Sequence, residues 1–341
     1  MLPSLAGLVG ASLRVVNTFM VAICGTRMHN TMNSLIAMLP MFGIFILLRN
    51  KDVTFRSLVL LAGMSGIGGG AFASSMSSIS FFFPKKKQGL ALGINAGLGN
   101  LGVSLSQLLV PLVATGSYFG PLSGDALSAK AEYWVQNAGF SYMVLLGIFS
   151  ALAFFTMHTM PGHGTGNLLG NLLNYLRMEV LGFLGGFTGV GIFILSVPYI
   201  KGPALVITRI FVLAAFCCIL TLTLLFVGAG AEVQKKLKTQ SAIFKDQHTW
   251  WQTYLYIMTF GSFIGYSSAF PKLIKDVYGY LPDGSVNPAM EGAAPRFAWM
   301  GPCIGSLARP IGGWLSDKFS GAAVTHWGAH SCSFNGRAGG E

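Results

Sequence analysis

The sequence predicts an all-α protein, a polytopic bundle of membrane-spanning helices. Of its 341 residues, 52% are hydrophobic and only 10% are charged, whereas a typical soluble domain is about 25% charged. The mean hydropathy is +0.61. The apolar residues are gathered in stretches of about 20, which is the length that a helix needs to cross a bilayer. Because lipid offers no hydrogen bonds to the backbone, so many spans require helices.

Nine stretches are apolar enough to be spans of this bundle. They cover about residues 2–24, 32–48, 57–83, 89–115, 141–160, 179–200, 203–230, 249–270 and 297–315. Charged or turn-rich joints separate them, among them 84–87, 167–174 and 235–238. The net charge of +11 is also typical of nucleic-acid-binding proteins. Here, however, the basic residues lie in short runs between apolar stretches, as in loops at a membrane surface. We therefore expect a multi-pass membrane protein with no nucleic-acid partner.

Arginines lie inside three of the predicted spans. Arg14 shares a helical face with small residues, and Arg309 does the same and is followed by Pro310, which should bend the helix. A guanidinium at mid-depth costs at least about 2.5–3.5 kcal/mol on an insertion scale, so we expect Arg14 and Arg309 to be functional. Arg209 lies near a span end, where its side chain can reach the surface.

The carboxylates are distributed differently from the arginines. None of the 11 acidic residues falls well inside a predicted span, and Glu179 only begins one. A buried charge without a counter-ion is costly, so we expect a mobile anion to neutralise the two arginines. The same distribution argues against a buried carboxylate that relays protons.

The glycine-rich stretch 89–103 has two interpretations. Gly97, Gly99 and Gly102 match the dinucleotide fingerprint, but that fingerprint requires a preceding strand, and a span end with three lysines precedes it here. We therefore expect no nucleotide and no other cofactor, and the apolar composition argues against a soluble enzyme. The spacing of Gly89, Gly93 and Gly97 instead predicts a smooth helix face for close packing. Gly301 and Gly305, on the same face as Arg309, predict a second such surface. His326, His330 and Cys332 lie in a short tail of unusual composition, where we expect no metal site.

Polar and aromatic side chains accompany these glycines. Asn95 and Asn100 lie near the glycine face. Tyr256 and Phe260 are four residues apart and share one face of the eighth span, and Phe72 lies in the middle of the third span. For most of the 26 phenylalanines plain packing is the stronger interpretation.

Together these residues form a familiar pattern. Residues 68–76, 81–89 and 91–103 resemble the nitrate signature of the nitrate/nitrite porter family, the NarK-type members of the major facilitator superfamily. Residues 10–14, 259–265, 301–309 and 312–318 support the resemblance. It implies a bundle of 12 helices in two six-helix halves, of which about nine spans are present here, and a location in the inner (cytoplasmic) membrane. One departure is Ala71, where many members of the family have asparagine.

The resemblance also implies which residues bind the substrate. The family's two substrate arginines match Arg14 and Arg309, and its aromatic walls match Phe72 and Phe260. Its substrate tyrosine matches Tyr256, and its signature asparagines match Asn95 and Asn100. The chain would then be a fragment that lacks the family's first helix and its last four. Its parts would be a remnant of the N-terminal half (1–160), a linker with two inserted helices (161–248), the start of the C-terminal half (249–319) and a divergent tail (320–341).

From these observations we expect a transporter of small inorganic anions, nitrate and nitrite, in a lipid bilayer. Exchange of one anion for another is favoured over proton symport, because two positive charges in an empty site would oppose its closure. The alternative is a truncated membrane remnant or a binding or regulatory fragment that transports nothing.

Overall fold

The computed structural model describes residues 2–338 except 51, 127–132, 201 and 291. The described residues form helices and no β-strand longer than an isolated bridge between Tyr280 and Val286. The long helices are α1 (Leu2–Cys24), α2 (Thr26–Leu47), α3 (Phe55–Phe82), α4 (Gln88–Ala114), α5 (Gln136–Thr156), α6 (Leu168–Ser196), α7 (Pro203–Gly228), α9 (Gln247–Tyr278), α11 (Met300–Phe319) and α12 (Gly321–Ala338). Shorter helices are α8 (Ala231–Gln240) and α10 (Ala293–Phe297).

Seven of these helical segments are long and apolar enough to cross a membrane. They are α1, α2, α3, the segment Lys85–Ala114 that contains α4, α5, α6 and α7. The all-α, polytopic membrane fold is therefore confirmed. The two remaining predicted spans coincide with α9 and α11, which are helices but do not belong to this apolar set, and their crossing of the membrane stays a prediction.

The chain forms two compact units, and each contains segments far apart in the sequence. The first unit consists of residues 1–78 and 112–246, and the second of residues 79–111 and 247–341. These units are defined by packing alone. The predicted division into the halves of a porter stays a prediction.

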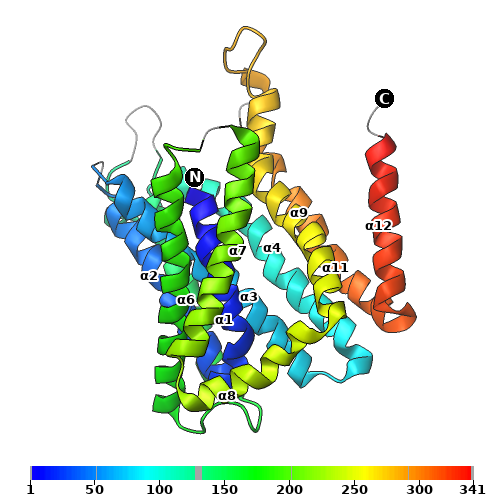
Figure 1. The fold of residues 1–341 in the computed structure, drawn as a ribbon. Coiled ribbons are helices and arrows are strands. Elements are labelled where there is room, and N and C mark those ends of the chain that lie inside the picture. Colours follow the sequence, from blue (N-terminus) through cyan, green and yellow to red (C-terminus); the bar gives the residue numbers. More distant parts are fainter. Residues whose placement is uncertain (1, 51, 127–132, 201, 291, 339–341) are drawn as a thin grey trace. The chain divides into compact units, whose positions relative to one another are not determined.

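Helix α1 forms the centre of the first unit. More than half of its 23 residues are buried, and they pack in two clusters against α6, α7 and α8. Val16 and Met20 belong to one of these clusters, together with Tyr175 of α6 and Leu225 of α7. Figure 1 shows α6 and α7 running side by side, and they contact each other as well as α1. The helices predicted as an insertion thus supply much of the core around α1.

Helix α6 begins earlier than the sequence predicted. Its first residue is Leu168 rather than 179, because the asparagines of 167–174 do not form a loop. The side chain of Asn167 caps the helix and accepts a hydrogen bond from the amide of Leu169 at 3.1 Å. The start of the predicted span at 179 is therefore wrong, and Glu179 lies well inside the helix.

The second unit is organised by the contact between α4 and α11. A Cβ atom added to Gly93 would lie 2.6 Å from the carbonyl oxygen of Arg309, and one added to Gly97 would lie 2.7 Å from that of Ser306. The carboxylate of Asp317 accepts hydrogen bonds from the amides of Gly89 and Leu90, both at 2.8 Å. Only residues without side chains allow the two helices to approach so closely.

Candidate functional site

In the first unit, Arg14 lies beside an aromatic ring of a second helix. Helices α1 and α3 cross at Gly10 and Gly66, where a Cβ atom on Gly66 would lie 2.7 Å from the amide nitrogen of Gly10. This crossing lets Arg14 Nε donate a hydrogen bond to the carbonyl oxygen of Gly69 at 3.1 Å. The guanidinium carbon lies 5.3 Å from the centre of the Phe72 ring. Arg14 and Phe72 are both half-buried.

In the second unit, Arg309 lies over two aromatic rings. Its guanidinium carbon is 5.6 Å from the ring centre of Phe260 and 5.0 Å from that of Phe263. Tyr256 stacks on Phe260 with a centre-to-centre distance of 4.9 Å and an angle of 7°. No carboxylate among the described residues lies within 4.0 Å of the Arg309 guanidinium. A half-buried cation over a stack of rings is therefore the central feature of this unit.

Phe263 is a member of this group that the sequence did not single out. It lies three residues after Phe260 on the same helical face, and this spacing was the available signal. A Cβ atom added to Gly305 would lie 2.9 Å from the Phe263 ring, so the glycine makes room for the ring. Gly301, by contrast, has no neighbouring atom within 4 Å of an added Cβ.

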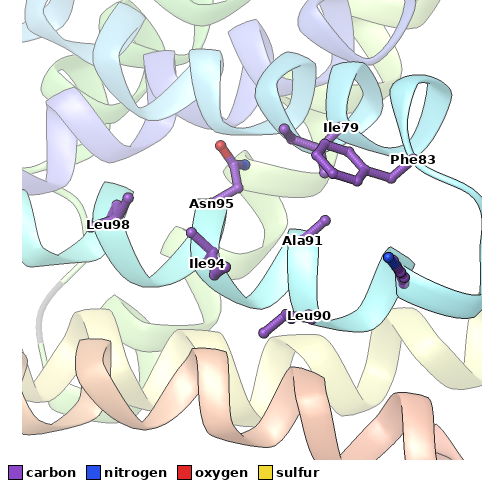
Figure 2. A pocket seen from close by; sticks show the side chains of 8 residues that line it. Ile79, Phe83, Leu90, Ala91, Ile94, Asn95 and Leu98 are labelled. Atoms are coloured by element: carbon purple, nitrogen blue, oxygen red, sulfur yellow. The ribbon is translucent and has the colours of Figure 1, made fainter.

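The two signature asparagines have different surroundings. The side chain of Asn100 is buried and donates a hydrogen bond to the carbonyl oxygen of Ala96 at 2.8 Å. Asn95 lines a pocket of about 360 Å³ that is otherwise mostly apolar. Figure 2 shows Asn95 there with apolar side chains of α3 and α4. The pocket is lined by Ile79, Phe83, Lys87, Leu90, Ala91, Ile94, Asn95 and Leu98.

The expectation that no carboxylate lies inside a span is wrong. Glu179 is only 2% exposed, and its Oε1 atom accepts a hydrogen bond from Nδ2 of Asn17 at 3.3 Å. The sequence argument failed because it placed the start of the helix at Glu179, whereas α6 begins at Leu168. The argument against a buried carboxylate that binds protons therefore no longer holds.

The chain is similar in sequence to known transporters. The chain is 33% identical over 330 residues to a probable nitrate/nitrite antiporter, NarK2, of Thermus thermophilus. It is 31% identical over 327 residues to the nitrate/nitrite transporter NarU of Escherichia coli (strain K12). Each alignment covers 95% of this chain, and the relatives are covered to 57% and 53%. The chain thus spans little more than half the length of the curated relatives it matches. No protein-family model matches it.

A shorter match has a similar level of identity. The probable nitrate transporter NarT of Staphylococcus carnosus is 31% identical over 149 residues, which is 43% of this chain and 32% of NarT. The relatives are bacterial transporters, and the described part of the chain contains seven membrane-capable helices. The prediction of a multi-pass protein of the inner membrane is therefore confirmed.

Proposed function

Because the chain is related to NarK-type nitrate/nitrite porters along 95% of its length, as its signature residues predicted, we propose that the whole protein carries nitrate and nitrite across the membrane. One observation carries the proposal: each unit places an arginine guanidinium over aromatic rings. These pairs are Arg14 with Phe72, and Arg309 with Phe260 and Phe263. The protein then has no enzymatic activity.

The chemistry of these pairs suits a small planar anion. Nitrate and nitrite carry one negative charge, and their oxygens lie in a plane. A guanidinium offers parallel N–H donors that bond two such oxygens at once. Aromatic rings beside it provide flat apolar surfaces and exclude water, which strengthens the charge-assisted hydrogen bonds. In this proposal Tyr256 and Asn95 contribute polar groups near the anion, whereas Asn100 acts by holding the backbone of α4.

We propose that nitrate is exchanged for nitrite. Two permanently charged guanidinium groups favour a cycle in which one anion leaves only as another binds. The printed name of the Thermus thermophilus relative also describes an antiporter. Proton-coupled uptake is the second candidate, and the buried carboxylate of Glu179 is the observation that favours it.

Transport by vesicles tests the proposal. The 341-residue chain and a version extended by the segments that its relatives carry beyond it are reconstituted separately, with or without internal nitrite. We expect the extended version to take up nitrate when nitrite is inside and to resist an uncoupler. Uptake that ignores internal nitrite and collapses with an uncoupler would establish proton symport. If neither version transports, the non-transporting alternative is correct.

A further inference from the structure

A cluster of buried polar side chains lies beside α1 in the first unit. Glu179 and Tyr175 lie one turn apart on α6, and both are almost completely buried. The Tyr175 ring centre is 5.7 Å from that of His29 on α2. Nε2 of His29 lies 2.5 Å from the Oγ atom of Ser74 on α3. At the other end of this cluster, Oε1 of Glu179 accepts a hydrogen bond from Nδ2 of Asn17 on α1.

This cluster connects the two elements that hold the first guanidinium–aromatic pair. Asn17 lies three residues after Arg14 on α1, so the two side chains are neighbours on the helix surface. Ser74 lies two residues after Phe72 on α3. A Cβ atom added to Gly70 of α3 would lie 3.1 Å from Nδ2 of Asn17. The carboxyl group of Glu179 is thus one hydrogen bond away from the helical turn that carries Arg14.

The cluster contains more hydrogen-bonding atoms than bonds. Within the described part of the chain, Oδ1 of Asn17 and Nδ1 of His29 are buried without a hydrogen-bond partner. Oη of Tyr175 and Oε2 of Glu179 are also buried, and neither has a partner with ordinary hydrogen-bond geometry. No lysine, arginine or histidine nitrogen among the described residues lies within 4.0 Å of the Glu179 carboxylate. An ionised carboxylate is costly in such surroundings, and this cost favours the binding of a proton. A protonated Oε2 would also supply a donor to a cluster that has several unused acceptors.

The charged and titratable groups around Glu179 are few. Tyr175 is on the same helix, Cys24 is on α1, and His29, whose ring lies beside Tyr175, is on α2. Arg14 of α1 lies one helical turn before Asn17, which is the hydrogen-bond partner of Glu179. Lys236 of α8 donates to the carbonyl oxygen of Ala22 at 3.1 Å. Of these groups, Arg14 is the one that the proposed function places against an anion. An anion bound at Arg14 would add a negative charge close to this helical turn, and in a medium of low dielectric constant one negative charge disfavours a second one nearby.

We propose that Glu179 is a proton-binding site in the inserted helix and takes up one proton from water when an anion binds at Arg14. The carboxylate becomes a carboxylic acid on anion binding, and the O–H bond breaks again when the anion leaves. This inference rests on the proposed function, because it requires that Arg14 binds the anion. It assigns the inserted helices a role in the transport cycle in addition to packing.

Infrared difference spectroscopy of the purified full chain in nanodiscs tests this site, with potassium nitrate as the probe. We expect the carbonyl band of a protonated carboxylic acid to titrate with pH, to vanish in Glu179→Gln and to persist in Asp283→Asn. Asp283 is a matched control because it lies on a fully exposed turn. Nitrate should increase the band, and nitrate affinity should rise up to about tenfold per pH unit of acidification in the parent but not in Glu179→Gln.

Several outcomes would overturn the inference. One is the absence of a band that Glu179→Gln removes, and another is nitrate binding that leaves the band unchanged. Loss of the band on replacing potassium with sodium at constant pH would identify a cation site instead. If neither the parent nor any variant binds nitrate at any pH, the proposed function fails together with this inference. If nitrate binds but the band does not change, only this inference fails. If Glu179→Gln does not fold, Glu179→Asp is used instead. It should retain the carbonyl band, but the pH at which the band is half-developed should change.

Discussion

The guanidinium groups of Arg14 and Arg309 can be tested by a substitution that retains their charge. Lysine keeps the positive charge but lacks the planar fork that bonds two oxygens at once. Loss of one charge-assisted hydrogen bond corresponds to about 1.5–3 kcal/mol, so we expect Arg14→Lys or Arg309→Lys to reduce nitrate uptake about 10- to 100-fold.

The control for this experiment is Arg56→Lys, at the exposed start of α3, which should leave uptake unchanged. The measurement is the initial rate of nitrate uptake at matched amounts of protein in the vesicles. Near-normal uptake by either lysine variant would remove that arginine from the proposed binding site.

His163 provides a prediction about pH. Partial burial, together with the nearby charge of Lys236, lowers the pKa of His163 below its ordinary value. The unfolded chain therefore binds a proton more readily than the folded chain, and stability should fall as the pH drops below about 6.5. We expect His163→Gln to reduce this loss of stability, measured as the unfolding temperature at several pH values.

The two causes of the lowered pKa of His163, burial and the charge of Lys236, can be separated by substitution. Because the charge of Lys236 disfavours a second positive charge, Lys236→Gln should raise the pKa of His163, as followed by NMR titration of the imidazole. The control Lys238→Gln changes a lysine two residues further along α8, where the side chain lies on another face of the helix. An unchanged pKa in Lys236→Gln would leave burial as the whole cause.

At the scale of helices, the packing of α4 on α11 predicts opposite effects for two glycines. A Cβ atom at Gly93 would lie 2.6 Å from a backbone carbonyl oxygen, whereas one at Gly99 would have no neighbour within 4 Å. Gly93→Ala should therefore cost about 1–3 kcal/mol through overpacking. Gly99→Ala should be neutral or stabilise by up to about 1 kcal/mol through helix propensity. Unfolding in detergent measures both, and equal effects would contradict the packing argument.

The helices themselves were largely predictable, because a span requires about 20 apolar residues and leaves a clear pattern. The errors occurred where polar residues belong to a helix. Asn167 and the residues after it resemble a loop, but the asparagine is an N-cap and the leucines that follow it are helical. The lysines of 235–238 resemble a joint, yet α8 buries Val233 and Leu237 on one face.

The candidate site was predictable only in part. The sequence singled out the two arginines, because they lie inside predicted spans, and the signature residues pointed to Phe72, Phe260 and Tyr256, but Phe263 was missed. Their pairing depends on contacts distant in sequence, such as the crossing of α1 and α3 at Gly10 and Gly66, which no local pattern encodes. The surroundings of Glu179 are also formed by a residue distant in sequence, because its hydrogen-bond partner Asn17 is 162 residues away.

At the scale of the whole molecule, the helices α6 and α7 are part of the framework of the first unit. They pack on the buried face of α1, where Asn17 hydrogen-bonds to Glu179 of α6 and Ser12 interacts with Cys217 of α7. Without these helices, that face would meet lipid, and its polar groups would lose their protein surroundings at a substantial cost. The first unit is thus stabilised by the segment that the resemblance identifies as an insertion.

Deleting residues 162–246 tests this role while preserving the orientation of the following helices, because two spans are removed together. We expect little folded protein, measured by size-exclusion chromatography and thermal unfolding in detergent. Co-expression of 162–246 as a separate chain should restore folding, since membrane helices associate after independent insertion. Removal of 321–341 is the control and should leave the packing around α1 intact, because α12 belongs to the second unit. A deletion variant as stable as the parent would show that α6 and α7 are an appendage, and the proton site assigned to Glu179 would then be dispensable for folding.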